Sequence, residues 1–138
     1  MTSGLYSYSK PEKLKSRKQI DALFANGQQL YAYPIKIFYT LTINEALQPN
    51  LLQAGVAVSS RYFKKAVHRN YIKRLLREAY RLNKVELKTT VYQKQVRLNL
   101  FIIYVGKEMP EKDKLPQVVK KLLLQLNQKL HEMDIEHT

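Results

Sequence analysis

Residues 64–81, KKAVHRNYIKRLLREAYR, combine many Lys and Arg side chains with an apolar repeat of helical period, and Glu78 is their single acid. At about 100° per residue, the polar side chains fall on one arc of a helix and the apolar ones on another. The polar arc consists of Arg69, Asn70, Lys73, Arg74, Arg77 and Arg81. The apolar arc consists of Ile72, Leu75, Leu76 and Ala79. The stretch therefore predicts a helix that buries one side and turns a cationic side outward.

Apolar stretches of strand type lie on both sides of this helix in the sequence. Residues 51–60, LLQAGVAVSS, precede it. Residues 96–106, VRLNLFIIYVG, follow it, and their almost unbroken apolar run is typical of a central strand that is covered on both faces. Residues 33–43, YPIKIFYTLTI, alternate between apolar and polar and predict a half-buried strand, which we expect to run antiparallel to residues 51–60. A brief strand near residues 29–31 is expected before it.

Two further helices are expected, one toward each end of the chain. Residues 16–27, SRKQIDALFANG, open with Ser16 and Gln19 at the spacing of a capping box, and their Asn-Gly pair is a stop signal. Residues 115–133, LPQVVKKLLLQLNQKLHEM, place apolar side chains along one stripe at helical spacing. Residues 83–95, NKVELKTTVYQKQ, are polar, and their pattern does not decide between a helical continuation and a loop.

The predicted order is helix, strands, helix, strand, helix. This order indicates an α+β fold with a single small sheet of about four strands and with three helices. A chain of 138 residues is expected to form one domain, residues 14–134, after a flexible basic N-terminal segment, residues 1–13. A helix that connects two parallel strands ordinarily makes a right-handed crossover.

Charge and composition narrow the class of partner. Lys and Arg number 24 against 11 Asp and Glu, which gives a formal net charge of +13. An excess this large in a small domain favours a polyanionic partner, nucleic acid before a membrane surface. The absence of cysteine excludes disulfides and thiolate metal sites, and no segment resembles a signal peptide or a membrane span. We therefore expect a cytoplasmic protein without a membrane partner.

The cationic arc of residues 64–81 indicates the same kind of partner. Four cations follow one another at i,i+4 spacing: Arg69, Lys73, Arg77 and Arg81. Their repulsion lowers helix stability unless acids or a bound polyanion relieve it. The planar guanidinium of arginine suits phosphate oxygens and base edges. A DNA-binding helix-turn-helix is not expected, because an apolar strand rather than a second helix precedes the basic helix.

The same helix closely resembles the signature of a known family, the bacterial ribonuclease P protein component. That signature is an Arg-Asn-Arg trio followed by Ile-Lys-Arg and Arg-Glu-Ala-aromatic, and residues 66–81, AVHRNYIKRLLREAYR, match most of it. Residues 55–67, GVAVSSRYFKKAV, resemble the family's glycine-containing strand and basic loop, and residues 14–27, LKSRKQIDALFANG, resemble its first helix. Tyr71 stands where the trio has its second arginine, and Lys107 is the nearest substitute for an arginine near the end of the last strand.

The resemblance implies a fold and a role. The fold is the ribosomal S5 domain 2-like arrangement of ribonuclease P proteins, in which the basic helix makes a left-handed crossover. The role is that of the protein subunit of the ribonuclease P ribonucleoprotein. Its catalytic RNA subunit holds the Mg²⁺ ions and cleaves precursor tRNA to leave the mature 5′ end. The chain itself would then hold no metal ion and supply no catalytic residue.

By position, the resemblance also assigns two sets of RNA-binding residues. The set expected to bind the catalytic RNA consists of Lys65, Arg69, Asn70, Lys73, Arg74 and Arg77. The set expected to bind the 5′ leader of precursor tRNA consists of Ile20, Phe24, Tyr39, Ser59 and Arg61. A single strand needs aromatic or apolar platforms beside cations, since stacking tolerates any base sequence. For Ile20, Phe24 and Tyr39, packing in the core remains an open alternative.

Two other functions remain open on the residues alone. A ribosomal or other structured-RNA-binding protein without a role in cleavage fits the same charge and the same basic helix. A self-contained nuclease would need a cluster of carboxylates to hold metal ions, and the 11 acids are scattered over predicted loops and ends. We therefore expect that the protein alone cleaves nothing.

Overall fold

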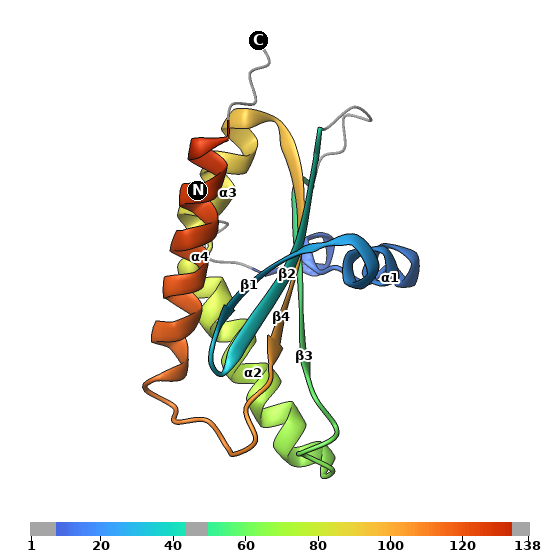
Figure 1. Ribbon diagram of the computed structural model, residues 1–138, viewed down its shortest axis with the longest axis vertical. Helices are drawn as coiled ribbons and strands as arrows, with labels where there is room; N and C mark the ends of the chain where they lie inside the picture. The colour runs from blue at the N-terminus through green and yellow to red at the C-terminus, as the bar shows by residue number, and fades with distance from the viewer. Residues whose placement is uncertain (1–7, 44–49, 134–138) are drawn as a thin grey trace.

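The computed structural model describes residues 8–43 and 50–133, which fold into one mixed sheet with four α-helices (Figure 1). A short 3₁₀ helix, Lys10–Glu12, precedes them. The α-helices are α1 (Arg17–Asn26), α2 (Ala66–Asn83), α3 (Val85–Lys94) and α4 (Leu115–Glu132). The strands are β1 (Gln28–Ala32), β2 (Ile35–Ile43), β3 (Leu52–Val58) and β4 (Val96–Tyr104). The expected α+β class is confirmed.

The prediction of three helices is wrong, because residues 83–95 contain a fourth helix, α3. Leu87 and Val91 lie one turn apart on it and are buried in the main core. Two such side chains make an apolar stripe that is too short to stand out within a polar stretch. The helix ends at Gln95, which adopts a left-handed conformation with φ 54°.

The strands lie in the order β1-β2-β4-β3, with the apolar strand β4 inside the sheet as expected. β2 is antiparallel to both β1 and β4, whereas β3 and β4 are parallel neighbours. β3 therefore runs opposite to β2 without pairing with it, because β4 separates them. Helices α2 and α3 form the crossover from β3 to β4, and its left-handed sense stays a prediction.

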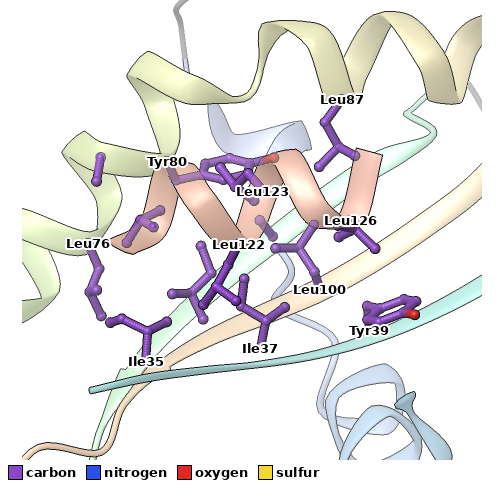
Figure 2. Close-up of a cluster of buried hydrophobic side chains, with 14 of the residues drawn as sticks. Ile35, Ile37, Tyr39, Leu76, Tyr80, Leu87, Leu100, Leu122, Leu123 and Leu126 are labelled. Carbon is purple, nitrogen blue, oxygen red and sulfur yellow. The ribbon is translucent and has the colours of Figure 1, made fainter. Parts of the chain in front are cut away.

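Helices α2, α3 and α4 cover one face of the sheet, and α1 lies on the other face (Figure 1). Alternate side chains of β2, namely Ile35, Ile37 and Tyr39, point into the main core beneath the three helices (Figure 2). The predicted stripe of α4 is buried there at Leu115, Val119, Leu122, Leu126 and Leu130, whereas Met133, also expected on the stripe, follows the helix and is exposed. The alternate side chains of each strand point to the other face of the sheet, which carries α1.

Helix α1 packs on that second face through Leu23, which belongs to the same buried cluster as Phe101 of β4. Ser16 accepts a hydrogen bond from the backbone N–H of Gln19 at 3.3 Å, as the capping-box spacing predicts. Gly55 of β3 lies beneath the ring of Phe101, where a β-carbon would come within 2.3 Å of a ring carbon. Glycine at this position therefore makes room for the ring on which α1 packs.

The sequence predicts a flexible segment over residues 1–13, but residues 8–13 pack along the edge of the sheet. Tyr8 donates its hydroxyl to the carbonyl of Ala54 in β3, and the same carbonyl accepts the backbone N–H of Leu14 at 2.9 Å. Residues 1–7 lie outside the described part of the chain. The segment from Tyr8 to Leu14 thus covers the outer edge of β3.

A buried ion pair ties this N-terminal segment to the junction of α2 and α3. The ammonium of Lys84 contacts the carboxylate of Glu12, and Lys84 is fully buried. Burial lowers the pKa of Lys84, and its hydrogen bond to Glu12 acts in the opposite direction. The ring of Tyr8 also packs edge-on against that of Tyr80 of α2, with centroids 5.3 Å apart. The N-terminal segment therefore bridges the sheet edge and the helical layer.

Candidate RNA-binding surface

Helix α2 is oriented largely as its wheel predicts. Its buried side chains are Ile72, Leu76, Ala79 and Tyr80. Leu75 is only half-buried, although the wheel places it on the apolar arc. Tyr80 is buried although it lies about 20° from Arg69 on that wheel. The N-terminal segment explains the difference, because Tyr8 covers this end of the helix.

The i,i+4 ladder of cations on α2 has partners within the protein at both of its ends. Nη1 of Arg69 donates to the carbonyl oxygens of Phe63 at 2.9 Å and of Lys64 at 2.8 Å. The guanidinium of Arg81 pairs with Glu78 at 2.5 Å, and this hydrogen bond lowers the pKa of the Glu78 carboxyl. Arg69 therefore holds the loop before α2, and the charge of Arg81 is partly neutralised.

The middle of α2 and the loop before it present the other cations. Of the residues expected to bind the catalytic RNA, Lys73 is half-buried, and the exposed ones are Lys65, Asn70, Arg74 and Arg77. Within the described residues, none of these five makes an ion pair. The guanidinium of Arg74 lies over the ring of Tyr71, 5.5 Å from its centroid. Tyr71 thus supports a neighbouring cation where the family signature has its second arginine.

A second candidate surface lies on the sheet face that carries α1. Phe24 of α1 is 41% exposed, and its ring lies edge-on to Phe38 and Phe101, with centroid distances of 5.0 and 5.4 Å. The register of β2 and β4 pairs Phe38 with Phe101 and Lys36 with Ile103, so these side chains share one face. The ammonium of Lys36 lies 5.7 Å from the ring centroid of Phe38. We call Phe24, Phe38, Phe101 and Lys36 the aromatic patch.

Tyr39 is not part of the aromatic patch, which corrects its assignment to the leader-binding set. It is 5% exposed and lies in the main core on the opposite face of the sheet (Figure 2), where burial raises its pKa. Its hydroxyl donates to Oε1 of Gln28 at 2.9 Å. Successive strand residues point to opposite faces, so Phe38 holds the place expected for Tyr39. The alternation that buries Ile35 and Ile37 already contained this signal.

Ile20 and Phe24 differ in what they offer to a ligand. Ile20 is half-buried and packs against the cluster that contains Leu23 and Phe101. Packing on the sheet therefore accounts for Ile20, as the open alternative allowed. Phe24 makes T-shaped contacts with Phe38 and Phe101 and keeps part of its side chain exposed. Of the two, Phe24 is the residue on which a base can stack.

Ser59 and Arg61 lie after the end of β3, and the structure adds two residues beside them. Oγ of Ser59 accepts a hydrogen bond from the backbone N–H of Arg61 at 3.2 Å. The guanidinium of Arg61 lies 5.5 Å from the ring centroid of Tyr62. The ammonium of Lys107, which follows β4, lies 5.8 Å from the same centroid. Sequence reasoning missed Tyr62, because only the pairing of β3 with β4 brings Lys107 to it.

The described residues contain no group of three or more His, Asp and Glu side chains placed to hold a metal ion. In residues 8–43 and 50–133, no helix is both long enough and apolar enough to cross a membrane. The chemistry that the two surfaces offer is binding, because cations contact phosphates and exposed rings stack on bases. A small α+β domain with a cationic helix face and an aromatic sheet face belongs to the class of nucleic-acid-binding proteins.

Comparison with known proteins makes that class specific. The family model described as Ribonuclease P matches residues 8–127. The ribonuclease P protein component of Porphyromonas gingivalis is 33% identical over 128 residues, which cover 91% of each chain. That of Chlorobium phaeobacteroides is 33% identical over 131 residues, which cover 88% of this chain and 90% of the relative. The chain belongs to the ribonuclease P protein component family.

Family membership gives the broad function. As a member, the chain is part of an endoribonuclease holoenzyme that processes tRNA, and the family implies an RNA partner in that ribonucleoprotein. The solved structure of the RNase P protein of Staphylococcus aureus is similar, with a TM-score of 0.55 at 18% identity. That match covers 88% of this chain and 95% of the other. At this identity the likeness supports the fold alone.

Proposed function

We propose that the chain binds the catalytic RNA of ribonuclease P through the cationic face of α2, and the 5′ leader of precursor tRNA through the aromatic patch. The position of Phe24 carries the proposal. Its partly exposed ring is braced by Phe38 and Phe101, and the ammonium of Lys36 lies over a neighbouring ring. Exposed rings beside cations bind single strands with little sequence preference.

On α2, the residues proposed to contact the catalytic RNA are Lys65, Asn70, Lys73, Arg74 and Arg77. Their amide, ammonium and guanidinium groups donate hydrogen bonds to phosphate oxygens, which suits a folded RNA whose backbone is its accessible surface. Arg69 has a different part in this proposal. Its hydrogen bonds to the carbonyls of Phe63 and Lys64 set the position of the loop that carries Lys65.

The Mg²⁺ ions of the reaction are proposed to be held by the RNA subunit, and the protein contributes charge. A net charge of +13 offsets the repulsion between two RNA molecules, so that less Mg²⁺ is needed to bring them together. The substrates are proposed to be precursor tRNAs, and the site of action is proposed to be the cytoplasm.

Cleavage of a precursor tRNA at low Mg²⁺ concentration tests the role. The RNA subunit alone, the protein alone and the two together are compared. We expect a product with the mature 5′ end only from the reconstituted complex. A structured-RNA-binding protein without a role in cleavage would leave the rate of the RNA subunit unchanged. Metal-dependent cleavage by RNA-free protein would contradict the proposal.

Binding measurements with two substrates test the aromatic patch. Phe24→Ala should weaken binding of precursor tRNA with a 5′ leader by about 1–3 kcal/mol if a base stacks on the ring. Binding of leaderless tRNA and of the catalytic RNA should be unchanged. Leu124→Ala, at an exposed apolar side chain of α4, is the matched control. Equal losses with both tRNAs, together with a lower unfolding free energy, would assign Phe24 to packing alone.

A further inference from the structure

A tyrosine ring lies close to two cations at the carboxyl ends of β3 and β4, outside the aromatic patch. Tyr62 is 39% exposed, with the guanidinium of Arg61 5.5 Å and the ammonium of Lys107 5.8 Å from its ring centroid. We call these three residues the Tyr62 cluster. Arg61 and Tyr62 follow β3, whereas Lys107 follows β4. The parallel pairing of the two strands therefore assembles the cluster.

The Tyr62 cluster lies beyond the carboxyl end of β3, on the side of the sheet that carries the aromatic patch. The register of β3 and β4 pairs Ala57 with Ile103, and both pack against the cluster of Phe101 on the face that carries α1. Ser59 is two residues further along, so the alternation of the strand directs it to that face too. The turn with Tyr62 begins directly after Ser59. A single strand that leaves the patch toward the carboxyl end of β3 therefore meets the Tyr62 cluster next.

The cluster also lies between the two proposed RNA surfaces. Lys64 and Lys65 follow Tyr62 after one residue, Phe63, and lead into α2. Arg69 binds the carbonyls of Phe63 and Lys64, so this loop has a fixed position relative to the helix. A ring held on such a loop is pre-organised for contact, which lowers the entropic penalty of binding.

We propose that Tyr62 is a stacking platform for one nucleotide of the tRNA leader, at a point where the strand has passed beyond Phe24. Arg61 and Lys107 contact the phosphates on either side of that nucleotide. A tyrosine ring stacks with any base, and the cations can exchange their contact with the ring for a phosphate oxygen. This inference rests on the proposed leader-binding function.

The test measures the affinity of the protein for a series of precursor tRNAs whose leaders lengthen by one nucleotide at a time. For the wild-type protein, affinity should rise again when the leader becomes long enough to reach Tyr62. Tyr62→Leu keeps apolar bulk but removes the aromatic face, and should lower affinity only beyond that length, by roughly 5- to 150-fold. Tyr33→Leu is the matched control, because Tyr33 is 62% exposed and lines a pocket with Leu115 and Val118 of α4.

A fluorescent base gives a readout that a structural role of Tyr62 would not change. With 2-aminopurine at the leader position where affinity rises, wild type and Tyr62→Phe should quench the fluorescence, and Tyr62→Leu should not. Lys107→Gln should reduce the slope of log affinity against log salt by about 0.7 for long leaders only.

Three other outcomes would each overturn the inference, and the measurements tell them apart. Equal affinity of wild type and Tyr62→Leu at every leader length would remove Tyr62 from the site, while a leader-dependent loss in Phe24→Ala would still support the aromatic patch. An equal loss for Tyr62→Leu with leadered and leaderless tRNA would show that the ring acts on the loop alone. Wild-type affinity that is independent of the leader would overturn this inference and the proposed leader-binding function together.

Discussion

Arg69 of α2 donates a hydrogen bond from Nη1 to the backbone carbonyl of Phe63, 2.9 Å away. The same nitrogen donates to the carbonyl of Lys64 at 2.8 Å. Phe63 is buried in the main core, while Lys64 and Lys65 are exposed beside it. A single guanidinium therefore fixes the position of two cations relative to α2. In the free protein, this signature arginine contacts the protein itself.

Arg69→Ala should weaken RNA binding by loosening this loop. We expect faster hydrogen exchange of the amides in residues 61–65 and a loss of about 1 kcal/mol in unfolding free energy, typical of a lost hydrogen-bond partner. The slope of log affinity against log salt should stay as in wild type, because no phosphate contact is removed. Hydrogen exchange measures the loosening of the loop, and binding at several salt concentrations measures the slope. A slope reduced by about one unit with unchanged exchange would show that Arg69 contacts a phosphate.

Arg77→Ala should leave the unfolding free energy almost unchanged but reduce the dependence of RNA binding on salt. Arg77 is exposed on α2 and forms no ion pair within the described residues, so its removal should change the unfolding free energy by less than about 0.5 kcal/mol. The salt slope should fall by about one unit, as expected for one lost phosphate contact. Lys121→Ala, at an exposed position of α4, is the control with equal loss of charge. Equal slopes for both variants would exclude Arg77 from the interface.

The elements of the fold could be predicted where one local pattern decides them. The almost unbroken apolar run of β4 indicated a central strand, and the spacing of Ser16 and Gln19 indicated the start of α1. Helix α3 could not be predicted, because its stability depends on burial in the main core more than on its own short stripe. The packing of residues 8–13 could not be predicted either. It depends on partners such as Lys84, which is 72 positions from Glu12.

The candidate site, too, could be predicted from the sequence only in part. A helical wheel places side chains on faces, but it does not contain the carbonyl groups upstream of α2 that bind Arg69. The family resemblance indicated Phe24 and Arg61, which the structure leaves accessible. It assigned Tyr39 rather than Phe38 to the leader, although neighbouring strand residues point to opposite faces. The register of β2 with β4 places Phe38 beside Phe101, on the face that carries α1.

Gly55→Ala should displace the ring of Phe101, which is part of the aromatic patch. A β-carbon at this position would lie 2.3 Å from a ring carbon of Phe101, so the ring must move and α1 with it. Overpacking of this kind lowers the unfolding free energy by about 1–3 kcal/mol. Phe101→Leu in the Gly55→Ala background should recover part of the loss, which chemical denaturation of the single and double variants measures as coupling. Additive losses would show that the two positions do not meet.

The dependence of stability on pH should report the packing of Tyr8 on the edge of β3. Burial raises the pKa of Tyr8 from 10.0 to about 12. The unfolded state therefore loses this proton first as the pH rises. The stabilisation is complete below about pH 10 and is lost between pH 10 and 12, with a total of about 3 kcal/mol.

Tyr8→Phe isolates this effect, because it keeps the ring against Tyr80 and removes the group that ionises. Other tyrosines and lysines titrate in both proteins, so they cancel when the unfolding free energies are compared. Wild type should lose stability more steeply than Tyr8→Phe from about pH 10 upward, and the difference between them should change by about 3 kcal/mol. Denaturation with urea at several pH values measures it. Parallel curves would mean that the Tyr8 hydroxyl is solvated in the folded protein and that the N-terminal segment does not cover the edge of β3.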